Sequence, residues 1–392
     1  MAKGSIAATI FRVSHPLQWD NLTSCESFVN GAPSMKKESW IGLAAVTFIL
    51  ISFAVLGYQR WSGSSPATRG ESLALMPPDA NAVLFADFDE LRHAAFIAEL
   101  YAWAPKPQAD AEYAQFLNDT GFDYERDLGR IAVAVEKHGA DSMLFAIADG
   151  KFDREKISAY ASESGTITKN GGHEIYSVPV GGSTKRISFT FLNKNRMALT
   201  DAPDLGVFLT MKAKSNDEAE WRARFERLAG SPIFAVIRQG ATAGSTLAAQ
   251  APGGLSSPQL SALLDQLQWI TLAGKPDNDR LRVVADGECN SEGTVRQLSD
   301  LLNGVILLAQ AGLNDPKARQ QLDPAAREAY LELLKNADVS KLDRGDTKSV
   351  RVILEITPKL LEAARTASPA ATPEAAPTKP PNKVAGQKKG RT

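Results

Sequence analysis

Two stretches of similar design decide the expected fold: IAVAVEKHGADSMLFAIADG at residues 131–150 and WITLAGKPDNDRLRVVADG at residues 269–287. In each, two apolar runs flank a polar turn that contains glycine, or proline and asparagine. This pattern predicts a β-hairpin. Both hairpins close on the tripeptide Ala-Asp-Gly, at 148–150 and 285–287. The sequence therefore predicts antiparallel sheets whose strands come in adjacent pairs.

The segments on either side of the hairpins also follow one plan. An apolar strand, 82–86 or 232–237, comes first, and a helix, 89–103 or 258–267, follows it. After each hairpin a residue suited to capping, Asp153 or Ser291, starts another helix. Strand, helix, hairpin, Ala-Asp-Gly and capped helix thus occur twice, which indicates a diverged internal repeat.

We expect an α+β fold of two related lobes, each a small antiparallel sheet with helices on one face, after one N-terminal transmembrane helix. The first lobe is expected at 73–230 and the second at 231–367. The remaining expected elements are helices at 109–119, 203–213, 216–229, 324–336 and 358–367, and strands at 173–180, 186–192, 196–200 and 350–356.

The expected transmembrane helix occupies residues 40–61. Its centre, IGLAAVTFILISFAVLG at 41–57, contains no charged residue and no side-chain amide. A run of this length crosses most of a hydrocarbon core of about 30 Å, and aromatic residues flank it where interfacial side chains belong. The residues that mark this membrane anchor are Trp40, Ile41, Leu50, Gly57, Tyr58 and Trp61.

Lysines set the expected orientation of this helix. Lys36 and Lys37 precede it, so the positive-inside rule places residues 1–39 in the cytoplasm and the large domain outside. The true start could instead be Met35. A cleaved signal peptide, with 65–67 (SPA) as its processing site, is the alternative, and the apolar run is longer than signal peptides usually carry. Both hypotheses place the large domain outside the cytoplasm.

Composition narrows the function classes. Residues 62–72 have the composition of a flexible linker, and 368–392 are a basic Ala/Pro/Lys tail expected to be disordered. A net charge of −1 gives no indication of a nucleic-acid partner.

The two cysteines, Cys25 and Cys289, fall on opposite sides of the expected membrane and do not form a disulfide framework. We expect no cofactor and no metal; the expected partners are the lipid bilayer and an envelope protein or polymer.

Four carboxylates are the candidate site residues: Asp87, Asp89, Asp123 and Asp127. Such acids serve acid–base catalysis or bind metals. The competing interpretation is that Asp87 and Asp89 stabilise a helix N-terminus. In the same interpretation Asp123 and Asp127 form surface ion pairs with Arg126 and Arg130. The sequence carries no catalytic signature, so whether the chain is an enzyme stays open. We expect a non-enzymatic binding or envelope-associated module; the alternative is an extracytoplasmic hydrolase or metal-dependent enzyme with a site between the lobes.

Three segments together resemble a family of uncharacterised bacterial envelope proteins with one N-terminal span: 77–83 (PPDANAV), 120–128 (TGFDYERDL) and 148–153 (ADGKFD). The likeness covers about 73–235. It implies a single-pass protein of the bacterial inner membrane with its main domain outside. It supplies no catalytic residues.

Overall fold

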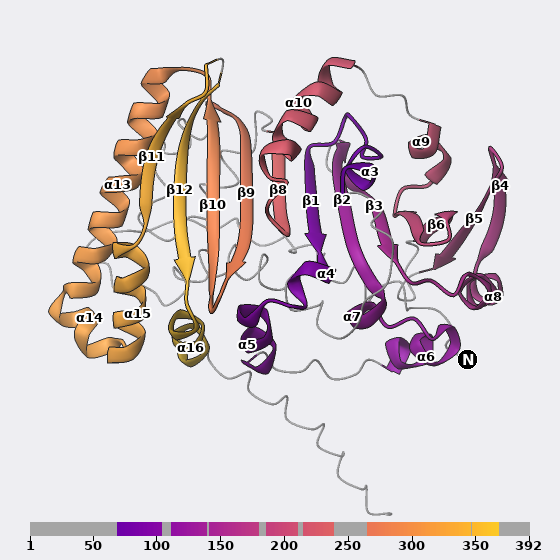
Figure 1. Cartoon of the computed structure of the whole chain (residues 1–392), viewed down its shortest axis with the longest axis horizontal. Coiled ribbons are helices and arrows are strands. Elements are labelled where there is room, and N and C mark those ends of the chain that lie inside the picture. The colour runs from indigo at the N-terminus through magenta and orange to yellow at the C-terminus, as the bar shows by residue number, and fades with distance from the viewer. Residues whose placement is uncertain are drawn as a thin grey trace, which may run out of the picture.

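A computed structural model describes residues 69–103, 111–138, 141–179, 186–210, 215–238, 265–345 and 347–367. Its centre is a 12-stranded sheet in the order β11-β12-β10-β9-β8-β1-β2-β3-β7-β6-β5-β4 (Figure 1). Every pairing in this sheet is antiparallel. The α+β class expected from the hairpins is confirmed.

Runs of strands and runs of helices follow one another along the chain. The strands are β1 Ala82–Asp87, β2 Leu128–His138, β3 Asp141–Gly150, β4 Thr166–Asn170, β5 His173–Pro179, β6 Arg186–Asn193, β7 Arg196–Thr200, β8 Ile233–Arg238, β9 Leu267–Asp277, β10 Arg280–Cys289, β11 Asp338–Asp343 and β12 Lys348–Ile356. The helices are α3 Arg69–Leu73, α4 Phe88–Leu91, α5 Ala95–Trp103, α6 Ala111–Thr120, α7 Tyr124–Asp127, α8 Arg154–Ser164, α9 Leu205–Thr210, α10 Ser215–Arg227, α13 Glu292–Asn314, α14 Pro316–Gln321, α15 Pro324–Lys335 and α16 Pro358–Ala367.

One sheet runs through both halves of the chain, where the sequence predicted a separate sheet in each. The join is the antiparallel pair β1–β8, in which Phe85 lies opposite Phe234 and their rings stack at 5.0 Å. Both strands are apolar on both faces, so each buries more surface between two neighbours than it would at an open edge. Outward from this pair the order is β2, β3, β7 on one side and β9, β10, β12 on the other.

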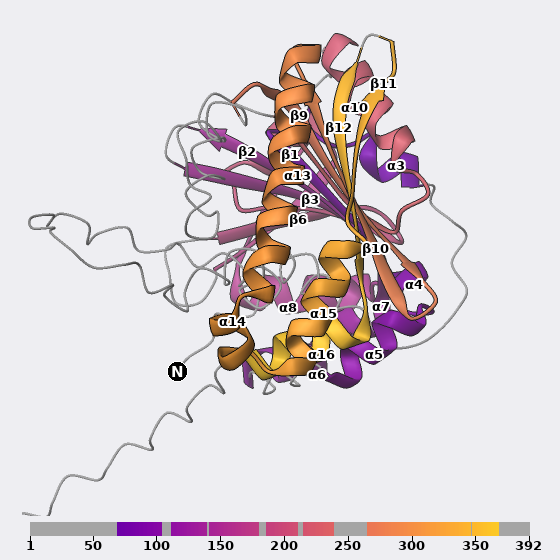
Figure 2. The ribbon, with the colours of Figure 1, turned by 90° about the vertical axis from the view of Figure 1, so that its left-hand side faces the viewer.

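Helices cover both faces of the sheet rather than the single face expected (Figures 1 and 2). α3, α9 and α10 lie on one face, above a core that contains Phe85, Phe145, Trp221 and Trp269. The opposite face packs against the other large helices in three clusters: α5, α15 and α16; α6 and α8; and α13. The strands therefore bury residues of both parities, which explains their nearly continuous apolar runs.

Several helix ends confirm the sequence-based capping. Asp153 accepts the N–H of Lys156 at 3.2 Å, and Ser291 accepts that of Thr294 at 3.1 Å. Asp323 accepts two amide hydrogens at the start of α15, where Pro324 occupies the first turn. A short polar side chain before each apolar helix satisfies amides that the helix itself leaves unbonded.

The single helix expected at 89–103 is divided into α4 and α5. Arg92 ends α4, and its buried guanidinium donates to the carbonyl oxygens of Glu125, at 3.0 Å, and Leu128. The N–H of Phe96 then donates to the carbonyl of Asn278 at 3.2 Å, in the β9–β10 turn. These contacts between distant segments redirect the chain, and local periodicity could not indicate them.

Five elements were not expected: α3, α7, α14, β4 and β11. α3 extends into the predicted linker 62–72, and its Ser72 is buried. β4 is exposed along its whole length and β11 is an edge strand, so neither shows an apolar pattern. The expected anchor at 40–61, most of the expected helix 258–267 and the tail 368–392 lie outside the described residues. In the part of the chain that is described, no helix is long and apolar enough to cross a membrane.

Candidate functional site

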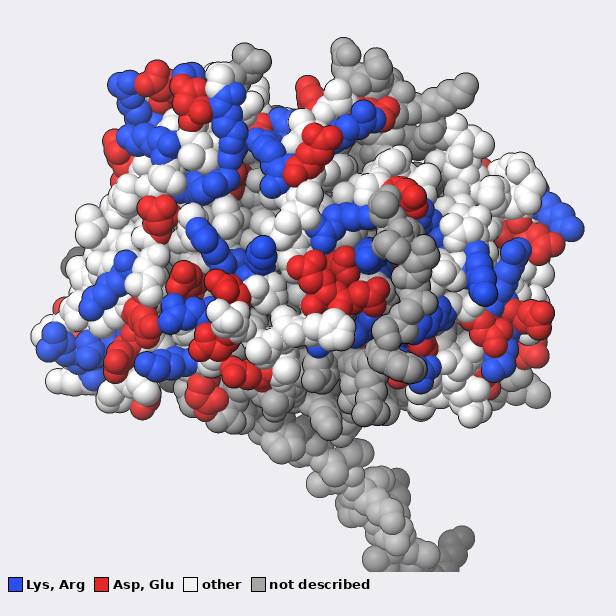
Figure 3. Space-filling model, in the orientation of Figure 1, with Lys and Arg blue, Asp and Glu red and all other residues white. Residues whose placement is uncertain are grey.

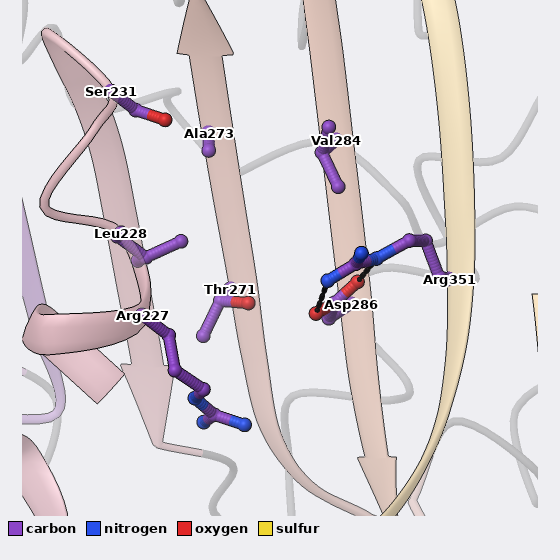
Figure 4. Close-up of a pocket in the computed structure, with 8 residues that line it drawn as sticks. All are labelled: Arg227, Leu228, Ser231, Thr271, Ala273, Val284, Asp286 and Arg351. Carbon is purple, nitrogen blue, oxygen red and sulfur yellow. Dashed lines mark hydrogen bonds and ion pairs between the residues drawn. The ribbon is translucent and has the colours of Figure 1, made fainter. Parts of the chain in front are cut away.

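A pocket of about 160 Å³ opens between the end of α10 and strands β9, β10 and β12 (Figure 4). It lies on the α10 face of the sheet, where β10 and β12 carry no covering helix among the described residues (Figure 1). Its lining residues are Arg227, Leu228, Ser231, Thr271, Ala273, Val284, Asp286 and Arg351.

Sheet register brings the polar lining residues together. Thr271 on β9 lies directly opposite Asp286 on β10, which lies directly opposite Arg351 on β12. Directly paired residues project to the same face, so the three side chains form a row across three strands. Arg227 lines the same pocket from the last turn of α10, and its guanidinium pairs with Glu288.

Asp286 is the anchor of this row. Its Oδ1 accepts Nε of Arg351 at 2.7 Å, and its Oδ2 accepts Arg351 at 2.8 Å and Arg344 at 3.1 Å. Burial by itself would raise the pKa of this carboxyl. The hydrogen bonds from Arg351 and Arg344 outweigh burial, so the pKa of Asp286 lies below its usual value.

A second buried carboxylate, Glu288, lies two residues further along β10. It is 1% exposed and forms ion pairs with Arg224 and Arg227 of α10. The guanidinium of Arg224 also lies 3.9 Å above the ring of Trp269. These contacts hold α10 against the sheet and fix the position of Arg227 at the pocket.

The first half of the chain contains a matching ion pair. Asp149 on β3 lies directly opposite Arg196 on β7 and accepts its Nε at 2.6 Å. Here α3 covers the pair: the hydroxyl of Ser72 donates to Asp149 at 2.6 Å, and Glu71 lies 3.4 Å from Arg196. Helix α3 thus covers the ion pair of the first half, whereas the ion pair of the second half lines a pocket.

Asp87 and Asp89 lie together at the start of α4, away from this pocket. Asp87 accepts the N–H of Glu90 at 3.1 Å and pairs with Arg130 at 2.7 Å. Asp89 pairs with Arg92 at 2.6 Å. The capping interpretation of Asp87 is confirmed. Figure 3 shows acidic atoms over α4, where Asp89 is half-buried and Glu90 is exposed to solvent.

Asp123 and Asp127 flank α7. Asp123 accepts the N–H of Glu125 at 3.0 Å, and Asp127 accepts the N–H of Asp123 at 3.0 Å. Asp127 also pairs with Arg126 at 2.6 Å, as the sequence suggested. All four candidate acids thus serve as caps or ion-pair partners, and none of them lines the pocket. Among the described residues, no group of three His, Cys, Asp or Glu side chains could hold a metal ion.

In each of the two ion pairs, Asp149–Arg196 and Asp286–Arg351, the acid belongs to a motif that the sequence shows, but the sequence does not show the ion pair. Asp149 and Asp286 are the acids of the two Ala-Asp-Gly tripeptides, which sequence reasoning used only as hairpin ends. Arg196 and Arg351 carry no local signal. They reach the acids through the β3–β7 and β10–β12 pairings, each of which joins strands that do not follow one another along the chain.

Comparison with known proteins finds only weak structural similarity. No family model and no curated protein matches the sequence. Among solved structures, crystal forms III, IV and I of TP0453 match 76%, 76% and 78% of this chain and 97%, 96% and 99% of theirs. Their sequence identities are 12%, 13% and 11%, and the TM-scores are 0.39, 0.38 and 0.37. A likeness this weak carries no argument about the role of the chain.

Proposed function

We propose that this protein is a membrane-anchored, extracytoplasmic binding module that holds its ligand in the pocket between α10 and β9–β10–β12. The membrane part of this proposal is supported by the uncharged run 41–57, its flanking aromatic residues and the lysines before it. The described domain would then lie outside the cytoplasmic membrane.

The binding part rests on one observation, the chemistry of the pocket's polar groups. Two of the pocket's polar groups, on Arg227 and Arg351, are guanidiniums, which as a class donate hydrogen bonds and do not serve as general bases. Asp286 is a weak base, because both of its oxygens already accept hydrogen bonds from arginines. Groups of this kind hold and orient a ligand, and they are poorly suited to general acid–base catalysis.

We also propose that the two halves of the domain are diverged copies of one unit. Three features support this: the strand order is matched on both sides of β1–β8, the hairpins end on the same tripeptide, and each tripeptide acid pairs with an arginine directly opposite. On this basis the pocket is the part of the second half that has diverged for binding.

Reporter fusions test the location. Alkaline phosphatase fused after Gly70 and after Thr392 should be active in both cases, because phosphatase matures only outside the cytoplasm. Green fluorescent protein at the same two positions should stay dark if it is exported unfolded. Active phosphatase at neither position would overturn the extracytoplasmic assignment.

Photo-crosslinking tests the binding role in cells. A photoreactive amino acid at Ser231, which lines the pocket, should yield a specific adduct that Arg227→Gln weakens. The same amino acid at Arg222, which is 63% exposed on α10, is the matched control. Adducts that are equal at the two positions, or that do not respond to Arg227→Gln, would remove the pocket from the proposal.

A further inference from the structure

The covered ion pair of the first half shows what the open pair of the second half lacks. Around Asp149 and Arg196, α3 supplies one hydroxyl, that of Ser72, and one carboxylate, that of Glu71. Besides the two hydrogen bonds from Arg196, Asp149 thus accepts one from an uncharged group, Ser72. Arg196 in turn lies close to a second carboxylate, that of Glu71. The groups bonded to one another here are two carboxylates and one guanidinium, and Arg130, opposite Asp149 on β2, has its own carboxylate partner in Asp87.

The second half reverses this balance. The third donor to Asp286 is the charged Arg344. Helix α10, which precedes β8 as α3 precedes β1, contributes Arg227 where α3 contributes the acid Glu71. Two clusters of ion pairs lie on this side of the sheet among the described residues: Asp286 with Arg344 and Arg351, and Glu288 with Arg224 and Arg227. Each cluster has two guanidiniums for one carboxylate, and Glu220 is a further acid near Arg224. The site therefore has an excess of positive charge, and no described carboxylate takes the part that Glu71 plays for Arg196.

Uncharged groups of the pocket are also available. Thr271 is only 4% exposed, and its hydroxyl has no hydrogen-bond partner among the described residues. Figure 4 shows this hydroxyl turned toward the Asp286–Arg351 pair, with the hydroxyl of Ser231 on the other side of the opening. This hydroxyl lines the pocket, so a ligand held there can form a hydrogen bond with it.

The size of the pocket limits what it can hold. A cavity of about 150 Å³ accommodates a benzene-sized molecule, so the pocket of about 160 Å³ has room for about six non-hydrogen atoms. Leu228, Ala273 and Val284 form its apolar wall. A fitting group therefore has a short carbon body with a charged end.

We infer that this pocket binds a carboxylate on a short carbon chain, with a hydroxyl or another hydrogen-bonding group beside it. Arg227 and Arg351 face the carboxylate, the hydroxyl of Thr271 bonds to the neighbouring polar group, and the apolar wall packs against the chain. A free hydroxy acid and the acidic end of a larger molecule share this chemistry. The inference rests on the proposed binding function and names its ligand class.

Calorimetric titration of the purified full-length protein tests the inference. Lactate, with six non-hydrogen atoms, is the carboxylate probe, and lactamide is its neutral counterpart of equal size. Inorganic phosphate is the competing anion. We expect lactate to bind and lactamide to bind at least about 10-fold more weakly, because a hydrogen bond to a charged group contributes more than one to a neutral group.

Two variants connect the binding to the pocket. Arg227→Gln should weaken lactate binding by about 10-fold or more, and Thr271→Val, which removes only the hydroxyl, by about fivefold. Arg222→Gln, on the exposed side of α10, should bind as the unmodified protein does. Thermal unfolding of each variant shows whether the fold is retained.

Three results would each overturn the inference: no lactate binding by the full-length protein, equal binding of lactate and lactamide, or lactate binding that neither pocket variant alters. Tighter binding of phosphate than lactate, lost in the same variants, would overturn the carboxylate assignment. In each case the phosphatase fusions and the Ser231 adduct still report separately on the proposed function. Competition between lactate and the adduct distinguishes a small acid from the acidic end of a larger partner.

Discussion

Asp149 and Asp286 make the same contact in the two halves of the sheet: each faces an arginine on the next strand and accepts its Nε, at 2.6 and 2.7 Å. The surroundings of the two pairs differ. The Arg196 side chain is 7% exposed and that of Arg351 is 31% exposed. The two acids should therefore contribute differently to stability, although their geometry is nearly the same.

Asp149→Ala should destabilise the protein more than Asp286→Ala. Removing Asp149 leaves Arg196 buried without its main partner, and such a change costs about 3–5 kcal/mol. Removing Asp286 leaves Arg351 partly open to water, so about 1–2 kcal/mol is expected. Midpoints of urea unfolding monitored by circular dichroism measure the difference. Equal losses would mean that the covering helix α3 has no effect on the first pair.

Acid should weaken the fold partly through Asp286. The pKa of this carboxyl is lowered in the folded protein, since its arginine hydrogen bonds outweigh burial. A lowered folded pKa stabilises the protein above the unfolded pKa, about 3.9 for Asp, and that stability is lost as the pH falls through the folded pKa. The free energy of unfolding should therefore fall below about pH 4. In Asp286→Asn the decline should be shallower, although the variant is less stable at pH 7. Parallel curves for the two proteins would contradict this.

Cys289 should react slowly in the folded protein. It is 7% exposed, and burial raises the pKa of its thiol to about 11. Compared with an ordinary thiol of pKa about 9, this leaves about 100-fold less thiolate at pH 8, and the thiolate is the reactive form. Ellman's reagent applied to a Cys25→Ser protein, folded and in guanidinium chloride, measures the ratio. Rapid labelling without denaturant would show that this edge of the core opens readily.

The glycines of the two Ala-Asp-Gly tripeptides should differ in their tolerance of alanine. A Cβ at Gly150 would lie 2.6 Å from the carbonyl oxygen of Asp127, which is backbone. A Cβ at Gly287 would lie 3.0 Å from the end of the Leu267 side chain, which can move. Gly150→Ala should cost about 1–3 kcal/mol and Gly287→Ala less than about 1 kcal/mol, as judged by thermal unfolding. Equal costs would indicate that Leu267 is held as rigidly as backbone.

The sequence by itself determined the local elements. The hairpins at 131–150 and 269–287, the capped starts of α8, α13 and α15, and the capping role of Asp87 follow from side-chain periodicity and from hydrogen bonds over three or four residues. The repeated Ala-Asp-Gly marked the ends of both hairpins, although not the ion pairs that its two acids form. These features depend on neighbours in the chain, so the order of residues suffices to find them.

Only the tertiary structure decided which strands meet and what the acids do. The β1–β8 pair joins the halves into one sheet, and the β10–β12 register places Arg351 opposite Asp286. The division of the helix after β1 depends on Arg92 and on Asn278 from a distant turn. Such contacts are set by the burial and register of segments far apart in the chain, and no local pattern encodes them. The pocket exists because α10 ends above three strands that the chain brings together in space.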